Sequence, residues 1–283
     1  MKTTPIVDAH VHIFPPELIA QRAQLLEQDT WFAEAFGHPK AKMTTVDDLI
    51  ISMDKAGVDL SIVVGWPWRS NELCARHNDY LAESAQRYPD RIKWLGIINP
   101  SAAAAIDEIT RCTDLGAIGF GEINADGQGF SWQNPEDFEE ALTAIAALGL
   151  TVMTHTSEPV GHIYPGKGLA HPQAILTAIE TVPVVKWMLA HWGGGLPFYE
   201  LMPEVKLACA NVSYDSAATS YLYNPAVFRN VIDLVGVEKV VFGSDWPVLA
   251  QGRLIKRIRE AGLSESELNA VLGGNALRIY GIT

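Results

Sequence analysis

The chain has 283 residues, of which 48% are hydrophobic and 19% charged, and its formal net charge is −12. This composition supports a large core and excludes a disordered chain. Because α/β barrels commonly use about 250 residues as one unit, we expect a single domain over residues 1–283. The acidic charge excludes nucleic acid and anionic membranes as partners, since phosphate binding requires clustered Lys and Arg.

The cysteines and the N-terminal stretch indicate the compartment. Cys74, Cys112 and Cys209 are widely spaced and form no CxxC pair, which predicts reduced thiols rather than disulfides or a zinc ribbon. The stretch MKTTPIVDAHVH has one basic residue and no apolar signal segment, and no apolar run is long enough to span a bilayer. We therefore expect a cytoplasmic protein that is not exported.

Short segments rich in Val and Ile alternate with longer amphipathic segments along the whole chain, a pattern typical of repeated βα units. The expected strands cover residues 6–13, 58–66, 92–99, 117–124, 151–156, 184–191, 210–215 and 239–245. The expected helices cover residues 46–56, 71–88, 102–115, 135–148, 169–181, 196–207 and 225–235, with two more after the last strand. Eight such units predict an α/β fold, a (β/α)8 TIM barrel, rather than an open sheet.

One connection departs from this regular pattern. Residues 14–45, between the first strand and the first regular helix, are too many for an ordinary βα loop and include Trp31, Phe32, Phe36 and His38. We predict that this insertion forms a lid over the mouth of the barrel.

The first strand carries the motif DAHVH. Side chains alternate faces along a strand, so His10 and His12 are expected to point the same way, with Asp8 one step deeper on that face. Two imidazoles can then meet one ion, although an HxH pair alone is a weak signal.

Three further residues strengthen the interpretation of His10 and His12 as metal ligands. His155, His191 and Asp245 each end an expected strand, the fifth, sixth and eighth, and barrel active sites are built at the C-terminal ends of the strands. A single His in such a place is more often structural, but four histidines and an aspartate on one rim favour a metal site. Imidazole and carboxylate donors suit zinc first, and also manganese, iron or cobalt.

With these motifs in order, from DAHVH on the first strand to GSDWP on the eighth, the chain resembles the amidohydrolase superfamily. The similarity is to its amidohydrolase-2 branch, the metal-dependent enzymes similar to aminocarboxymuconate-semialdehyde decarboxylase. The resemblance implies that His10, His12, His155 and Asp245 hold a single divalent ion and that His191 orients or activates a water. It also implies a homodimer, for which the lid could supply the interface.

Glu122 in GFGEIN ends the fourth strand, where other branches of the superfamily supply a bridging residue. It is a candidate further metal ligand, and if it bridges, two ions fit. The alternative is a carboxylate that accepts a proton from a ligand histidine or binds substrate.

Candidate substrate-binding residues lie near the same strand ends. They are Trp66, Arg69, His162, Tyr164, Lys167, Trp192 and Asp215. An Arg among aromatic residues could grip a carboxylate, but Trp66 and Arg69 could equally stack on each other at the surface. Asp215 could equally belong to a hydrogen-bond network within the rim.

The first functional hypothesis is a metal-dependent hydrolase of a small carboxylate-bearing substrate, such as an amide, lactone or cyclic imide. Metal-activated water would attack the carbonyl, and His191 or Asp245 would move the proton. The alternative, which the resemblance implies, is a nonoxidative metal-dependent decarboxylase. A third, remote hypothesis is a non-catalytic ligand-binding barrel.

Overall fold

All eight expected strands form in the computed structural model, which describes residues 4–283. Residues 1–3, part of the stretch used to exclude a secretory signal, lie outside the described residues. The strands are β1 Val7–His12, β2 Leu60–Val64, β3 Ile92–Trp94, β4 Gly119–Ile123, β5 Thr151–Thr154, β6 Lys186–Leu189, β7 Val212–Asp215 and β8 Val240–Val241.

The strands close into a barrel. β1, β2 and β3 pair in chain order, and so do β4 to β8, every pair parallel. Parallel bridges from Gly96 to Phe120 and from Val11 to Trp246 join the two sets of strands at both edges. Closure confirms the predicted (β/α)8 barrel and places all strand C-termini at one end.

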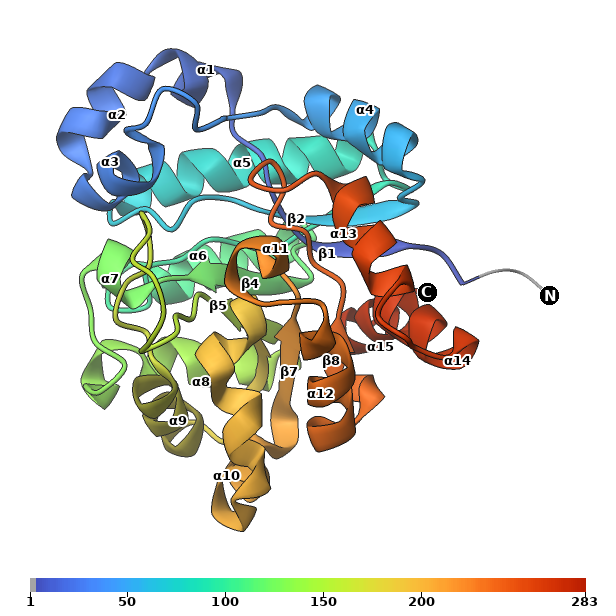
Figure 1. Cartoon of the computed structure of the whole chain (residues 1–283). Helices are drawn as coiled ribbons and strands as arrows, with labels where there is room; N and C mark the ends of the chain where they lie inside the picture. Colours follow the sequence, from blue (N-terminus) through green and yellow to red (C-terminus); the bar gives the residue numbers. More distant parts are fainter. Residues whose placement is uncertain (1–3) are drawn as a thin grey trace.

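Helices surround the strands (Figure 1). The α-helices are α1 Pro16–Ala20, α2 Arg22–Gln28, α3 Thr30–Phe36, α4 Val46–Ala56, α5 Asn71–Arg87, α6 Ala105–Asp114, α7 Ala125–Gln128, α8 Glu139–Ala147, α9 Pro172–Thr181, α10 Pro203–Ala208, α11 Thr219–Leu222, α12 Ala226–Val235, α13 Gln251–Arg259, α14 Glu265–Asn269 and α15 Asn275–Tyr280. Shorter 3-10 segments are η1 Pro135–Asp137, η2 His191–Leu201, η3 Cys209–Asn211 and η4 Val237–Lys239, and η5 Ala270–Gly274 is a π-helical turn. No helix of the described chain is long and apolar enough to cross a membrane.

The helix expected over residues 196–207 is shorter in the structure. Only Pro203–Ala208 is regular helix, and the preceding η2 begins with five consecutive residues, 191 to 195, that have positive φ. Three of these are glycines, which tolerate this conformation. The chain therefore turns sharply after β6 before the helix begins.

Two apolar clusters hold the fold together. The smaller one contains Val7, Ile62, Met153 and Met188, which come from strands around the barrel, together with Tyr280 of α15. The larger one fills the space between the strands and the surrounding helices. Side chains alternate along each strand, so those that point into the barrel form the smaller cluster and those that point outward join the larger one. A packed interior of this kind is expected for such a barrel.

The insertion of residues 14–45 forms α1, α2 and α3, which lie together at one edge of the molecule (Figure 1). Phe32 and Phe36 stack with ring centroids 4.8 Å apart, and both contact the ring of Trp66 edge-on. Trp31 and Phe36 line the same cavity as His12 and Asp245. The predicted lid is therefore confirmed, and its aromatic face is anchored on the segment that follows β2.

Candidate metal centre and active site

β1 brings His10 and His12 together but turns Asp8 away. Between Asp8 and Val11, β1 advances three residues while its partner β2 advances two, which is a β-bulge. The carboxylate of Asp8 accepts hydrogen bonds from the backbone and hydroxyl of Ser244, at 2.8 and 2.6 Å. The prediction that Asp8 shares the face of the two histidines was wrong because strict alternation fails at a bulge.

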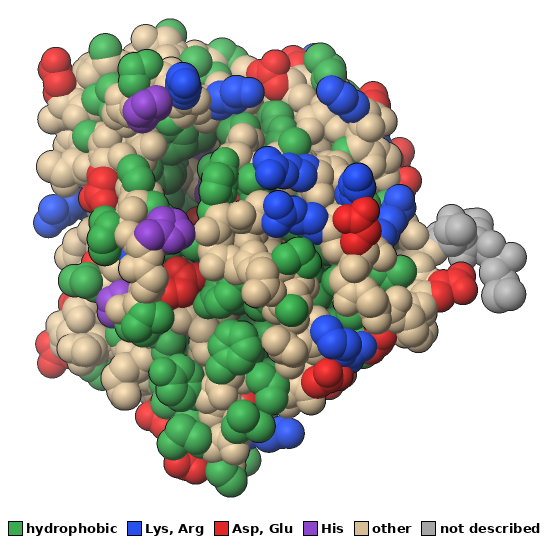
Figure 2. Space-filling model, in the orientation of Figure 1, with side chains coloured by type: hydrophobic (Ala, Val, Ile, Leu, Met, Phe, Trp, Pro, Cys, Tyr) green, Lys and Arg blue, Asp and Glu red, His purple; other side chains and the backbone are tan. Residues whose placement is uncertain are grey.

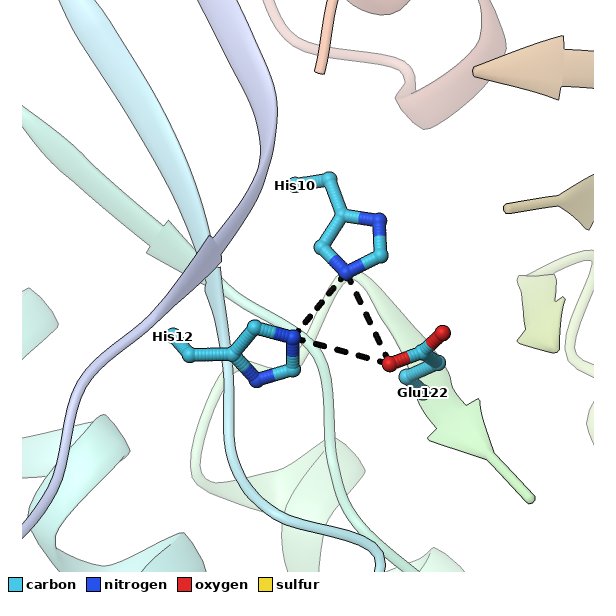
Figure 3. A group of neighbouring side chains, drawn as sticks. All are labelled: His10, His12 and Glu122. Atoms are coloured by element: carbon cyan, nitrogen blue, oxygen red, sulfur yellow. Dashed lines mark hydrogen bonds and ion pairs between the residues drawn. The ribbon is translucent and has the colours of Figure 1, made fainter. Parts of the chain in front are cut away.

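Six side chains from five strand ends converge at the C-terminal end of the barrel: His10, His12, Glu122, His155, His191 and Asp245. Nε2 of His10 lies 3.1 Å from Nε2 of His12, and Oε2 of Glu122 lies 3.6 and 3.5 Å from these two atoms (Figure 3). Oδ1 of Asp245 lies 3.5 Å from Nε2 of His12. Such separations are those of neighbouring ligands in one coordination sphere.

Glu122 links two overlapping groups of donors. Its Oε1 lies 3.1 Å from Nδ1 of His155 and 3.4 Å from Nε2 of His191, while Oε2 faces His10 and His12. Either half could hold a cation. The structure therefore places Glu122 at the middle of the site, as a ligand or bridge would be.

The outer ring nitrogens of three histidines face groups that only accept hydrogen bonds. The partners of His10, His12 and His191 Nδ1 are Asp215 Oδ2 at 2.8 Å, Gly65 O at 3.2 Å and Ala217 O at 3.3 Å. Each Nδ1 must therefore carry a proton, which leaves the Nε2 lone pair for the centre of the site. Lone pairs of His10 and His12 facing each other at 3.1 Å repel unless a cation or a proton lies between them, so the donor set fits a divalent metal ion.

In the absence of a metal ion, the carboxylates around these histidines favour protonation of their imidazole rings. Burial disfavours a charged His10, but Asp215 and Glu122 outweigh burial and raise its pKa well above the ordinary value. Burial also opposes charge on His191, but Glu122 and then Asp245 raise its pKa to about 9. Burial would raise the pKa of Glu122, but His10 and its neighbours hold it well below the usual range.

Two glycines let the backbone come close around these residues. A Cβ at Gly121 would collide with the carbonyl of Met153 on the neighbouring strand, just before Glu122. A Cβ at Gly194 would collide with the carbonyl of Ser157, just after the turn that carries His191. Gly121 of GFGEIN and Gly194 of HWGGG are therefore required by close packing at the site.

The centre lies at the bottom of a cavity of about 540 Å³. A hollow bordered by hydrophobic, basic and histidine side chains is visible on the face shown in Figure 2. The cavity is lined by His12, Glu122, His155, His191 and Asp245 and by the lid and loop residues Trp31, Phe36, Lys40, Lys42, Trp66, Asn124, His162, Tyr164, Tyr221 and Val248, among others. This volume suits a small organic molecule.

Three of the predicted substrate-binding residues, Trp66, His162 and Tyr164, line the cavity. The prediction is wrong for two others, because their side chains are buried behind the site. Asp215 is fully buried against His10, and Trp192, also fully buried, donates from Nε1 to the hydroxyl of Thr219 at 2.9 Å. The positive φ at Trp192 directs its side chain away from the cavity.

Arg69 and Lys167 also do not line the cavity. Arg69 is exposed on the segment between β2 and α5. The ammonium of Lys167 donates to the carbonyls of Val160 at 2.7 Å and His162 at 3.0 Å, so it braces its own loop.

Sequence reasoning missed several residues of the cavity wall. Asn124 lines it two positions after Glu122, and the twofold period of a strand could have found it. Lys40 and Lys42 enter the wall from the lid, where no periodic pattern predicts which side chains face inward.

The fold and the donor set define a metal-binding (β/α)8 barrel with its centre at the C-terminal ends of the strands. The amidohydrolase family model matches residues 7–282, so the chain belongs to the amidohydrolase family and is an enzyme of that family.

Curated relatives include two decarboxylases. The 2-amino-3-carboxymuconate-6-semialdehyde decarboxylase of Dictyostelium discoideum is 27% identical over 252 residues, covering 76% of this chain and 68% of the relative. The gamma-resorcylate decarboxylase of Polaromonas sp. is 23% identical over 282 residues, covering 83% of each chain.

Solved structures agree on the fold. The 5-carboxyvanillate decarboxylase of Sphingomonas paucimobilis aligns with a TM-score of 0.83 at 22% identity, over 99% of this chain and 100% of that chain. The enzyme of the same name from Novosphingobium aromaticivorans, complexed with manganese and 4-hydroxy-3-methoxy-5-nitrobenzoic acid, gives 0.81 at 17% identity, over 98% and 96%.

Proposed function

We propose that this enzyme is a metal-dependent nonoxidative decarboxylase of a small carboxylic acid. The observation that carries the proposal is the six-residue donor set at the bottom of a cavity with an aromatic wall, in a chain whose curated relatives are named as decarboxylases. These relatives favour the decarboxylase alternative over the hydrolase that the sequence first suggested.

In this proposal His10, His12, Glu122, His155 and Asp245 hold one divalent ion. Imidazole donors suit zinc, but two solved relatives hold manganese, which makes manganese the first ion to test. A bound divalent cation would supply Lewis-acid stabilisation of negative charge on substrate oxygen atoms.

Decarboxylation breaks the bond between the carboxylate and its carbon. Carbon dioxide leaves, the electron pair stays on the carbon, and a proton must then be added there. His191 is suited to hold that proton at Nε2, because Glu122 and Asp245 raise its pKa to about 9 despite burial and because the residue lines the cavity. Asp245, which lines the cavity and whose Oδ1 lies 3.5 Å from Nε2 of His12, is the second candidate proton carrier.

Hydrolysis is kept as the second candidate function because of one observation, the central position of Glu122. Its two oxygens face two separate pairs of histidines, the arrangement expected of a carboxylate that bridges two ions. A two-ion site suits attack by metal-activated water on a carbonyl.

The test is product analysis with protein loaded with manganese or zinc. The substrates are a panel of hydroxybenzoates and a panel of small lactones, amides and cyclic imides. The proposal predicts release of carbon dioxide from at least one acid, its loss in His191→Asn, and retention of activity in the surface variant His38→Asn. Turnover confined to the lactones, amides or imides would establish the hydrolase instead.

A further inference from the structure

The loop between β5 and α9, residues 155–171, forms part of the cavity wall through His162 and Tyr164. It is tied to the rest of the molecule at two backbone positions. Gly166 N donates to Glu34 of α3 at 3.2 Å, and Leu169 N donates to Asp126 of α7 at 2.7 Å. The loop is therefore fastened to both the lid and the segment that follows β4.

Within this loop the Tyr164 phenol is held by a buried carboxylate. Its hydroxyl donates to Oε2 of Glu158 at 3.0 Å, and Glu158 is only 9% exposed. Burial and then the charge of Glu158 raise the pKa of Tyr164 above its ordinary value, so the phenol keeps its proton. An ionised carboxylate can only accept hydrogen bonds, and the single phenolic proton is therefore directed at Glu158.

The ring of Tyr164 is fixed as well as its hydroxyl. The ammonium of Lys167 lies 5.6 Å from the ring centroid and is itself held by two backbone carbonyls of the loop. The ring of His162 lies 5.4 Å away on a tilted plane. A side chain held at both ends presents its remaining hydrogen-bonding capacity in one direction.

With its proton committed, the Tyr164 oxygen can offer the cavity only lone pairs. We propose that Tyr164, oriented by Glu158, is a specificity-determining residue that accepts a hydrogen bond from a hydroxyl or amino group of the substrate. The inference rests on the proposed function for the identity of the substrate as a small acid. It adds that the acid carries a donor group away from its carboxylate.

The experiment compares ligands that differ only in this donor. Calorimetry with the manganese-loaded protein measures the dissociation constants of benzoate, the three monohydroxybenzoates and the three methoxybenzoates, whose ether oxygen can accept but not donate. A neutral hydrogen bond changes affinity by about 3- to 10-fold. We expect one hydroxybenzoate to bind tighter than benzoate and its methoxy counterpart by this factor, and Tyr164→Phe to remove the preference while benzoate binding stays within about twofold.

Tyr88→Phe is the matched control, because the Tyr88 hydroxyl also donates to a carboxylate, that of Asp47 at 2.7 Å, but Tyr88 does not line the cavity. The preference should survive this change. Absence of a preference in the native protein, its survival in Tyr164→Phe, or its loss in Tyr88→Phe would each overturn the inference. Turnover is scored separately: a Tyr164-dependent preference without release of carbon dioxide from any acid would leave the inference standing and remove the decarboxylase proposal.

Discussion

Oδ2 of Asp215 lies 2.8 Å from Nδ1 of His10, and both side chains are completely buried. The other oxygen of Asp215 accepts from the backbone nitrogens of His191 at 3.0 Å and Ala217 at 2.9 Å. One carboxylate thus sets the tautomer of a candidate metal ligand and the position of a candidate proton donor, which is the role of a carboxylate behind a metal-binding histidine.

Asp215→Asn should therefore weaken metal binding. The amide can place its NH2 group against Nδ1 of His10, which would move the imidazole proton to Nε2 and block the lone pair. We expect manganese affinity to fall about 10- to 100-fold, measured by competition with a fluorescent chelator. Asp233→Asn, the same change at an exposed carboxylate, should leave the affinity unchanged. Equal affinities in the two variants would show that Asp215 does not act on the metal centre.

His12→Ala should remove the metal ion and the activity together. Nε2 of His12 lies near Glu122 and Asp245, and its Nδ1 is held by the carbonyl oxygen of Gly65. Loss of the imidazole therefore opens one side of the coordination sphere. Elemental analysis should give about one ion per chain in the native protein and below about a tenth in the variant. His38→Ala, at an exposed lid position, is the control. A full metal complement in His12→Ala would remove His12 from the ligand set.

Glu122→Gln separates the one-ion from the two-ion site. If the site holds one ion, loss of the carboxylate should lower the affinity for the metal ion by at least about 10-fold. The number of ions bound per chain at saturation should not change. Folding should be retained, because the amide can still accept a hydrogen bond from His155 or His191. Two ions in the native protein and one in the variant would make Glu122 a bridge and support the hydrolase.

The sequence predicted which side chains meet at the centre of the site because each lies at a strand end, and the ends of parallel strands meet by topology. His155, His191 and Asp245 come from strands far apart in the sequence and still reach one centre. Their positions needed only the strand count and the direction of the strands.

The positions that failed depend on local backbone geometry. A bulge separates Asp8 from His10, and a left-handed turn carries Trp192 into the core behind the site, against Phe228 at a centroid distance of 5.0 Å. Asp215 ends β7 as predicted, but it points at His10 rather than at the substrate. Neither period nor composition determines which neighbour a buried carboxylate meets.

Arg22 should control the lid. Its guanidinium donates to the carbonyl oxygens of His38 and Ala41, each at 3.0 Å, and to that of Phe36, so it holds the turn that carries the cavity-lining residues of the lid. In Arg22→Ala we expect KM to rise several-fold, kcat to stay within about twofold, and trypsin to cleave faster after Lys40.

Arg87→Ala, which breaks an exposed ion pair with Asp47 away from the lid, is the control for this change. It should alter neither KM nor the rate of cleavage after Lys40. Cleavage at the native rate in Arg22→Ala would mean that the aromatic packing of the lid, and not Arg22, holds this turn closed.

His77 should make the folded state sensitive to acid. The imidazole is completely buried, with Nε2 donating to Ile13 O at 2.7 Å and Nδ1 accepting from Nε1 of Trp68 at 3.0 Å. Burial lowers its pKa from 6.5 to about 3, against the opposing effect of the hydrogen bond to Ile13. The unfolded chain therefore binds a proton below pH 6.5 that the folded chain does not bind until about pH 3.

This difference has no effect on the free energy of unfolding above pH 6.5 and lowers it by about 1.4 kcal/mol per pH unit as the pH falls from there toward 3. The side chain in His77→Gln keeps a donor and an acceptor but cannot titrate. As the pH falls, the unfolding free energy of this variant should therefore decrease less steeply than that of the native protein, by about 1.4 kcal/mol per pH unit. Urea unfolding of both proteins with chelator present, at pH values from 7.5 to about 4.5, measures the two slopes without a contribution from metal binding. Both proteins contain the other histidines and carboxylates, so their titration cancels in the comparison. Parallel curves would mean that the folded chain accommodates a charged His77.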